Sequence, residues 1–272
     1  MKLLAWDTSS KTGALAAIEW EPGAKSKQPR LVSEWTLNVD TQHSERLLWA
    51  IHELLESARW KLDEIDAFGV GVGPGSFTGL RIGITTARTL AHAKGKPLVG
   101  VSSLAALARP VSLSVSSQSI VIATTDACKG ELFALWGASR GVAECVAMAQ
   151  GDFPGLWKRG VEERVLTPDE LIKRIQKKVK GATTRSGTRW IAVGEGRNRY
   201  PESWALLRTS ENQPSQPFSD QVQGRYVALL AWEGLQAGLG RDALLVHPRY
   251  VRASDAELKL KAKARLLARA PE

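Results

Sequence analysis

The sequence predicts an α/β protein in which mixed sheets flanked by helices form two lobes. Near the N-terminus, three short apolar segments alternate with turn residues, and the apolar residues then recur with helical spacing before a buried strand. A similar order begins again near residue 120, with a strand that ends at Asp126, a turn at Gly130 and another strand. Strands followed by alternating strands and helices are typical of a mixed sheet covered by helices.

The first half of the chain contains an antiparallel meander of three strands, two helices and two further strands. In the first helix, Leu47, Ile51 and Leu54 fall on one stripe, as expected for a helix that packs on a sheet. A glycine-rich loop, residues 73–77, precedes the second helix. We expect strands at residues 2–6, 14–20, 31–39, 67–72 and 97–101, and helices at residues 44–58 and 78–94.

The second half restarts the fold with strands at residues 120–125 and 132–136. A helix follows Pro168, because proline suits an early helical position and Asp169 and Glu170 suit the first turn. We expect that helix to end before Gly181, loops at residues 183–188 and 212–219, and a last helix near 222–237. The predicted domains are a first lobe (residues 1–104, joined by the helix near 222–237), a second, basic lobe (105–220) and a C-terminal segment with a basic tail (238–272).

Length and composition restrict the class of protein. The 272 residues, 43% of them hydrophobic and 24% charged, suffice for a buried core and exclude a disordered tail. There is no run of about 18 apolar residues, and the N-terminal apolar stretch reaches Asp7 too early for a signal peptide. We therefore expect a cytoplasmic protein with no membrane partner.

The net charge of +9 is concentrated in the second half. Residues 1–104 carry 12 basic and 11 acidic side chains, whereas residues 105–272 carry 25 and 17. Nine basic residues lie between Lys173 and Arg199, and five more between Lys259 and Arg269. Such clusters indicate either a polyanion partner, nucleic acid above all, or a solvated helix face and a frayed C-terminus.

The glycine-rich segment from Gly71 to Gly83 joins a buried strand to a helix, where backbone N–H groups can receive an anion. It matches neither the Walker spacing nor GxGxxG, so it is a weak nucleotide signal. Asp7 and Asp126 each end a strand. Next to hydroxyl-bearing turns they could hold a hydrated magnesium ion beside phosphates, or simply cap their own turns.

Small residues recur every four positions along the second helix, at Gly79, Gly83, Ala87 and Ala91, with Leu80, Ile84 and Leu90 beside them. A face without bulk allows close helix packing, and glycine inside a helix costs about 1 kcal/mol relative to alanine, so something must compensate. The stripe indicates either an interface with another chain or tight packing on the protein's own sheet or first helix.

Metal and nucleophile motifs are poor. The sequence has no HxxxH, HExxH or GxSxG, and His43 and His52 are nine residues apart, which excludes a typical zinc protease or serine hydrolase. Cys128 and Cys145 form no CxxC pair, and we expect two packed thiols. No metal site is predicted.

Several segments together resemble the TsaB (YeaZ) family. They are Asp7-Thr8-Ser9, the highly specific run GPGSFTGLRIG at residues 73–83, and Val99 to Leu104. Further segments are Asp126 to Phe133, similar to the family's Asp-Ala-Arg-Arg-Gly-Glu-Val-Tyr, the glycine pair Gly194 and Gly196, and the closing Pro248-Arg249-Tyr250-Val251-Arg252. The match extends from Leu3 to Arg252. Lys129 and Phe133 stand where the family often has Arg and Tyr, and the tail is long and basic.

The resemblance implies a two-lobe actin-like ATPase (ribonuclease H-like) fold. It also implies a role in transferring a threonylcarbamoyl group to N6 of adenosine 37, in tRNAs that read codons beginning with A. Members of the family are not themselves the transferase in that picture. They pair with a homologous TsaD subunit, which carries the metal and the catalytic site, and work with the TsaE ATPase; a homodimer is expected when the partner is missing.

The family further implies that a helical bundle from the first lobe holds the partner, which favours the interface interpretation of the small-residue stripe. The interface residues so assigned are Leu48, Ile51, Gly79, Leu80, Gly83, Ile84, Ala87, Leu90 and Ala91. We expect no catalytic residue and no tightly bound cofactor, with Mg-ATP or ADP at the complex interface. The nucleotide-binding candidates are Asp7, Thr8, Ser9, Gly75, Ser76, Asp126, Gly194 and Gly196.

The principal alternative is an actin-fold ATP-dependent phosphotransferase or ATPase that acts alone, with Asp7 and Asp126 around Mg-ATP. A metallopeptidase related to glycoprotease-like proteins is disfavoured by the missing histidine pair. A simple tRNA-binding module would bind RNA with strong salt dependence and without a protein partner.

Overall fold

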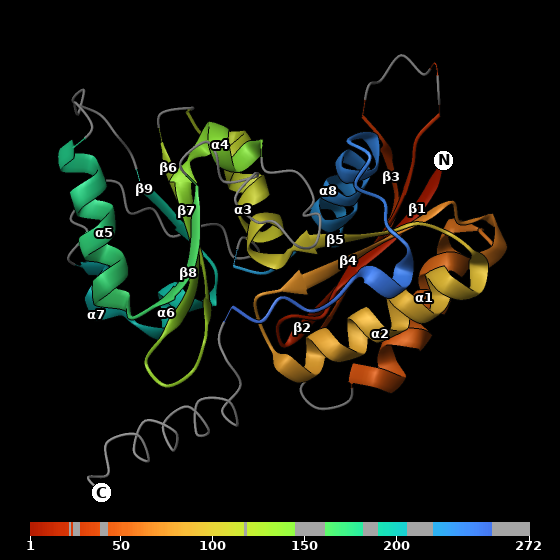
Figure 1. Ribbon diagram of the computed structural model, residues 1–272, viewed down its shortest axis with the longest axis horizontal. Helices are drawn as coiled ribbons and strands as arrows, with labels where there is room; N and C mark the ends of the chain where they lie inside the picture. The colour runs from red at the N-terminus through yellow and green to blue at the C-terminus, as the bar shows by residue number, and fades with distance from the viewer. Residues whose placement is uncertain are drawn as a thin grey trace, which may run out of the picture.

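Five strands of the first half form one sheet (Figure 1). The computed structural model describes residues 1–21, 23, 28–38, 43–116, 119–144, 161–181, 190–205 and 220–251. Cys145, the loops predicted at 183–188 and 212–219, and the basic tail at 253–272 lie outside these residues. The strands of this sheet are β1 (Lys2–Asp7), β2 (Thr12–Glu19), β3 (Arg30–Asn38), β4 (Ala67–Gly73) and β5 (Leu98–Ser102).

The strand order of this sheet is β3-β2-β1-β4-β5. β1, β2 and β3 are antiparallel neighbours, as the meander predicts, whereas β4 and β5 continue the sheet in parallel with β1. The parallel part requires crossovers, which helices provide. The sheet is therefore mixed. Because β1 and β4 are parallel, the loops that follow them lie at the same edge of the sheet.

The second sheet repeats this arrangement on a smaller scale. Its order, β8-β7-β6-β9, has an antiparallel meander on one side of β6 and a parallel strand on the other. The predicted restart of the fold near residue 120 is thus confirmed. The two outer strands had no clear sequence signal, because one is charged and the other has only four residues. The strands are β6 (Ile120–Asp126), β7 (Leu132–Ala138), β8 (Glu162–Leu166) and β9 (Trp190–Val193).

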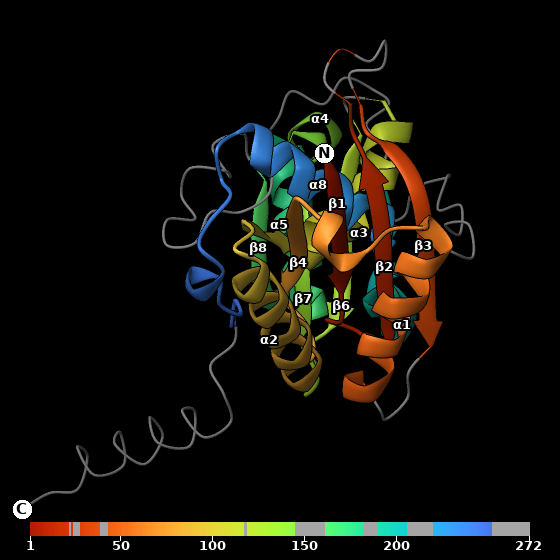
Figure 2. The ribbon, with the colours of Figure 1, turned by 90° about the vertical axis from the view of Figure 1, so that its right-hand side faces the viewer.

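Two layers of helices cover the first sheet. Figures 1 and 2 show α1 (His43–Ala58) and α2 (Phe77–Lys94) side by side on one face, with α8 (Gly224–Gln236) on the other. The period of two in β1 sorts its side chains, so Leu4 and Trp6 join the core under α1 and α2. Leu3 and Ala5 join the core on the opposite face. The 3₁₀ segments η1 (Leu62–Glu64) and η3 (Ala243–Leu245) complete this part.

The helix α3 (Ser103–Ser114) was missed by the sequence analysis. It begins directly after β5, where the Ser102 hydroxyl accepts a hydrogen bond from the amide of Ala105 at 3.1 Å. Pro110 inside the helix is the reason that the pattern reads poorly. Buried apolar residues of α3, of both sheets and of α8 belong to one cluster, so the two halves share a core.

The outer face of the second sheet packs on α5 (Pro168–Gly181) and α7 (Pro201–Ala205). Ile122, Trp136 and Leu171 lie in this second core. The short helices α4 (Ser139–Ala143) and α6 (Glu195–Arg199) lie at the ends of β7 and β9. We call the first sheet with α1, α2 and α8 the first lobe, and the second sheet with α4 to α7 the second lobe. The domain limits proposed from the sequence, at residues 104 and 220, stay a prediction.

Candidate functional site

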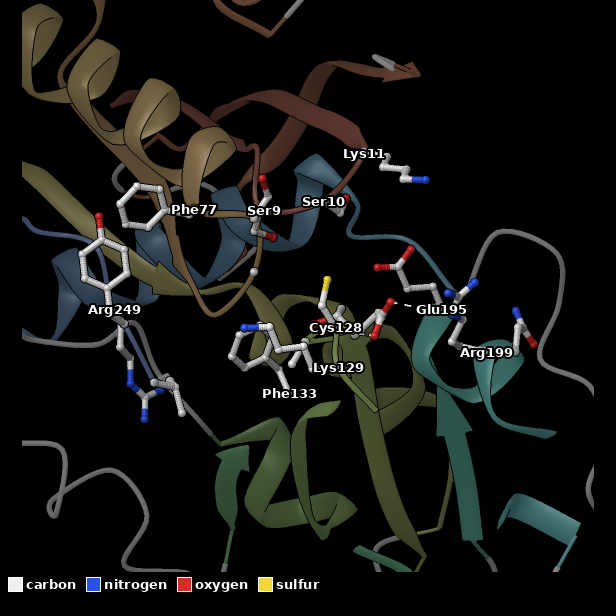
Figure 3. Close-up of a pocket in the computed structure, with 18 residues that line it drawn as sticks. Ser9, Ser10, Lys11, Phe77, Cys128, Lys129, Phe133, Glu195, Arg199 and Arg249 are labelled. Atoms are coloured by element: carbon white, nitrogen blue, oxygen red, sulfur yellow. Dashed lines mark hydrogen bonds and ion pairs between the residues drawn. The ribbon is translucent and has the colours of Figure 1, made fainter. Parts of the chain in front are cut away.

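A cavity of about 880 Å³ lies between the lobes, where β1 and β6 end. Figure 3 shows that Ser9, Ser10 and Lys11 border it from the β1–β2 turn, and that Cys128 and Lys129 face them from the β6–β7 turn. We call this cavity the cleft. Further walls come from the start of α2, from α6 and from the segment after η3. The lining residues outside the two turns include Gly75, Ser76, Phe77, Phe133, Glu195, Asn198, Arg199, Arg249, Tyr250 and Val251.

Four of the eight predicted nucleotide-binding residues border the cleft: Ser9, Gly75, Ser76 and Asp126. The loop before α2 packs tightly on the β1–β2 turn, since the Ser76 amide donates to the Ser9 carbonyl at 2.6 Å. A Cβ at Gly75 would lie 2.2 Å from that same carbonyl oxygen. The glycine therefore allows a close approach of two backbone segments, which needs no phosphate to explain it.

Asp7 does not border the cleft, contrary to the expectation that it faces a magnesium ion. Its side chain is fully buried, and its two oxygens are occupied: Ser9 donates its amide and hydroxyl to Oδ1, at 2.8 and 2.6 Å, and Ser103 donates its hydroxyl to Oδ2 at 2.5 Å. A Cβ at Gly71 would lie 1.8 Å from Oδ2. Burial raises the pKa of this carboxyl above its usual value.

These contacts decide the fit of Mg-ATP to the predicted residues. A hydrated magnesium ion needs exposed carboxylate oxygens, and those of Asp7 lie inside the protein. Asp126 does border the cleft, but its Oδ1 accepts from the Cys128 amide at 2.9 Å and from the Tyr200 hydroxyl at 3.3 Å. The pair of strand-end carboxylates therefore does not form the predicted metal-nucleotide site. Across the residues that the structure describes, no cluster of three or more His, Cys, Asp or Glu is suited to a metal ion.

The remaining nucleotide candidates have structural roles. Thr8 is buried and donates its hydroxyl to the Gly79 carbonyl at 2.7 Å. Gly194 has a φ of 98°, and a Cβ there would lie 2.0 Å from the Thr124 carbonyl oxygen. A Cβ at Gly196 would lie 2.7 Å from the Leu132 side chain. Gly194 is thus required by a neighbouring segment of its own chain, and Gly196 packs closely against one.

The small-residue stripe of α2 faces inward, so its assignment to a partner interface is wrong. A Cβ at Gly79 would lie 2.0 Å from the Thr8 carbonyl oxygen, and one at Gly83 would lie 2.2 Å from the Thr8 hydroxyl. The stripe permits α2 to approach the end of β1 at nearly backbone distance, which is the alternative that the sequence left open. The predicted interface residues buried in the monomer are Ile51, Gly79, Leu80, Gly83, Ile84, Ala87 and Ala91.

The residues on the outward faces of α1 and α2 are mostly not the predicted interface residues. Leu48, which was predicted at the interface, is 55% exposed, and Leu90 is half-buried. Trp49 was missed: it is 51% exposed and makes an edge contact with Trp35, with ring centroids 5.8 Å apart. The helical period could have found Trp49, because it lies beside Leu48 and outside the buried stripe.

Glu163, the ion-pair partner of the cleft-lining Arg249, was also missed. Its side chain is fully buried, forms an ion pair with Arg249 and accepts a hydrogen bond from the Ser102 hydroxyl at 3.0 Å. Burial raises the pKa of Glu163 to about 7, against the opposing effect of Arg249. It therefore connects the second lobe to the β5–α3 junction and to the segment after η3. The short, charged strand around it gave no sequence signal of burial.

Aromatic side chains lie at the mouth of the cleft. Phe77, the first residue of α2, stacks on Tyr250, with centroids 5.2 Å apart and an interplanar angle of 29°. The guanidinium carbon of Arg81 lies 3.9 Å from the Phe77 ring centroid, and its Nε donates to the Tyr250 hydroxyl at 3.1 Å. Cys128, expected as a packed thiol, is exposed in the opposite wall because its turn projects into the cleft.

Comparison with known proteins assigns the family. The chain is 31% identical to the tRNA threonylcarbamoyladenosine biosynthesis protein TsaB of Escherichia coli K12, over 78% of this chain and 80% of that protein. The chain belongs to the TsaB family. The Haemophilus influenzae TsaB protein is 30% identical over 72% of this chain and 75% of its own length. Residues 36–152 also match the family model of TsaD, tRNA N6-adenosine threonylcarbamoyltransferase.

Solved structures agree with this TsaB assignment. The structure titled YeaZ from Pseudomonas aeruginosa covers 92% of this chain and 100% of its own, with a TM-score of 0.62 at 27% identity. A second P. aeruginosa structure, titled as similar to peptidase YEAZ, gives a TM-score of 0.64 at 25% identity. The family and the two-lobed actin-like fold that the resemblance implied are thereby confirmed. In the described part of the chain, no helix has the length and apolar character to cross a membrane.

Proposed function

We propose that this TsaB-family protein is a non-catalytic assembly subunit in threonylcarbamoyladenosine biosynthesis. Its family places it in that pathway, which modifies tRNA. The observation that carries the non-catalytic role is the burial of Asp7, whose oxygens are taken up by Ser9 and Ser103. A strand-end carboxylate enclosed in this way serves the fold and does not reach a substrate.

The partner in this proposal is a TsaD-type catalytic subunit that transfers the threonylcarbamoyl group to N6 of adenosine 37. A TsaE-type ATPase completes the complex, and tRNA binds to the assembly. The match of residues 36–152 to the TsaD family model supports pairing of two related subunits. In the absence of that partner, the surface that would bind it forms a homodimer. Because the substrate is tRNA, we place the complex in the cytoplasm.

The corrected candidate for the partner surface is the outward face of α1 and α2 in Figure 2. Leu48 and Trp49 expose large apolar side chains at neighbouring positions of α1. Tryptophan is enriched among the few residues that carry most of the binding energy at protein interfaces. The buried stripe of α2 contributes indirectly, since it fixes the helix against β1.

No resident cofactor is part of this proposal. Mg-ATP or ADP acts instead at the interface of the assembled complex. The enclosure of Asp7 supports this placement, because the magnesium site predicted from the sequence would need its oxygens.

Reconstitution tests the proposal. The purified chain, a TsaD-family subunit and a TsaE-family ATPase are combined with unmodified tRNA, ATP and a donor of the threonylcarbamoyl group. Mass spectrometry of the digested tRNA measures the modified nucleoside. We expect modification with all components, a severe loss when this chain is omitted, and none with this chain as the only candidate transferase. Modification by this chain without the TsaD-family subunit would overturn the proposal, as would ATP turnover by the isolated chain that Asp7→Asn abolishes.

A further inference from the structure

The mouth of the cleft carries an exposed aromatic stack. Phe77 is 44% exposed and Tyr250 47%, although the two rings stack on each other. They come from segments that are far apart in the sequence, and the Arg249 amide fixes the second segment by donating to the Val72 carbonyl at 2.8 Å. A pair of aromatic rings kept in the solvent on a fixed backbone provides a stacking surface rather than a core contact.

One cation contacts this stack, and others line the cleft across from it. Arg81 lies over the Phe77 ring, and Lys11, Lys129 and Arg199 border the cleft from three different elements (Figure 3). The acidic side chains of the lining are fewer. The Asp126 Oδ2 atom lies 3.9 Å from Nε of Arg199, and Glu195 is exposed at the start of α6. The lining is therefore cationic overall, next to an aromatic surface.

Rings flanked by cations favour one class of ligand. Proteins bind single-stranded nucleic acid by stacking bases on aromatic side chains while Lys and Arg contact the phosphates. An acidic peptide would use the cations but not the exposed rings. The continuation of the chain points the same way: beyond Val251, which borders the cleft, the remaining 21 residues include six Lys or Arg and three Asp or Glu.

We propose that the mouth of the cleft binds a single-stranded segment of the tRNA substrate, with a base stacked on the Tyr250–Phe77 pair and phosphates near Lys11 and Arg199. This inference rests on the proposed function, which supplies tRNA as the substrate. It assigns to this chain a direct RNA contact besides the contact with its protein partner.

The first experiment measures RNA affinity of the full chain by fluorescence anisotropy, with a labelled anticodon stem–loop RNA as the probe. Loss of one stacking ring costs about 1–3 kcal/mol per base, so Tyr250→Ala and Phe77→Ala should each weaken binding by about 5- to 150-fold. Tyr250→Phe keeps the ring and should bind like the wild type. Leu113→Ala, at an apolar residue on α3 that is at least as exposed as the two rings, is the matched control. Circular dichroism melting confirms that each variant is folded.

A salt titration tests the phosphate contacts. On a single strand, each neutralised phosphate contributes about −0.7 to the slope of log K against log salt concentration. Lys11→Ala and Arg199→Ala should each make that slope shallower by about this amount, whereas Tyr250→Ala should weaken binding with little change in slope. Unchanged slopes in both lysine and arginine variants would overturn the phosphate assignment.

Three other results would overturn the proposal. If removal of residues 253–272 abolishes binding while Tyr250→Ala and Phe77→Ala bind normally, the tail alone contacts RNA. If AMP competes with the RNA at equal concentration, the cleft is a mononucleotide site. If the ring variants lose the TsaD-family subunit but keep RNA, the stack is a protein interface. Complex formation with that subunit is measured in parallel, so failure of the RNA contact is distinguishable from failure of the proposed assembly role.

Discussion

Glu163 and Arg249 form an ion pair that ties the second lobe to the segment after η3. The carboxylate is fully buried, and the Ser102 hydroxyl donates to it from the end of β5. Three segments that are distant in the sequence therefore meet at one buried acid. Breaking a buried pair by removing one partner typically costs about 3–5 kcal/mol, because it leaves the other charge buried and unpaired.

The raised pKa of Glu163 predicts a pH-dependent stability. Its pKa is 4.5 ordinarily and about 7 in the fold, so the folded state holds the proton more tightly than the unfolded state between these values. Stability from this group is present below about pH 4.5 and is lost as the pH rises to about 7. Glu163→Gln removes this titration. The free energy of unfolding is measured in urea at about pH 5 and pH 8. From the lower to the higher pH, that of Glu163→Gln should rise relative to that of the wild type by up to about 3 kcal/mol.

Arg249 stays charged between about pH 5 and pH 8. The loss of its partner in Glu163→Gln therefore changes the free energy of unfolding by the same amount at every pH in this range and does not alter its pH dependence. A stability difference between Glu163→Gln and the wild type that does not change with pH would contradict the assignment.

A second prediction concerns the stripe on α2. Gly83→Ala should destabilise the protein by about 1–3 kcal/mol, because the new Cβ would lie 2.2 Å from the Thr8 hydroxyl, which donates to the Gly79 carbonyl. The gain in helix propensity, about 1 kcal/mol, offsets part of this cost. Thr85→Ala, on the exposed face of the same helix, should be nearly neutral. Urea unfolding of both variants measures the difference.

Partner binding provides the opposite test for this stripe. If Gly83→Ala is as stable as the wild type but no longer binds the TsaD-family subunit, the stripe is an interface after all. We expect a destabilised variant that still binds while it is folded.

The sequence contained enough information for the architecture because both periodicities are strong in the first half. The meander, the stripe of α1 with Leu47 and Leu54, and the glycine loop before α2 all occur where the patterns predict. The patterns of α3 and of the second half are weaker. The helix α3 contains Pro110, and β8 includes three charged residues in succession, Glu162, Glu163 and Arg164. Neither sequence therefore has the pattern that is typical of its secondary structure.

The candidate site was harder to predict because period and spacing do not show which face of a helix is covered. Small residues at Gly79 and Gly83 indicate a close approach, but the sequence does not say whether the approaching group belongs to another chain or to Thr8. Tyr250 lies 173 residues after Phe77, and no local pattern connects them. Contacts of that kind depend on the tertiary fold.

A third prediction separates a structural from a nucleotide role for Asp7. Asp7→Asn should lower stability by about 1–3 kcal/mol, because its amide nitrogen cannot accept the hydrogen bonds that Ser9 or Ser103 donates to the two carboxylate oxygens. Binding of ADP by the isolated chain, measured by calorimetry, should be the same before and after the change. A variant that keeps its stability but loses ADP binding would restore the ATPase alternative.

The last prediction concerns Leu48 and Trp49 on the outward face of α1. Truncation of a hot-spot residue costs at least about 2 kcal/mol, so Trp49→Ala should weaken binding to a TsaD-family subunit about 30-fold or more, and Leu48→Ala should weaken it in the same direction. Leu113→Ala serves as control, since this α3 side chain is 56% exposed but lies outside the α1 and α2 face. Calorimetric titration measures the affinity, and sedimentation of the isolated chain shows whether the same variants shift a homodimer to monomer. Wild-type affinity in both α1 variants would move the partner to another surface.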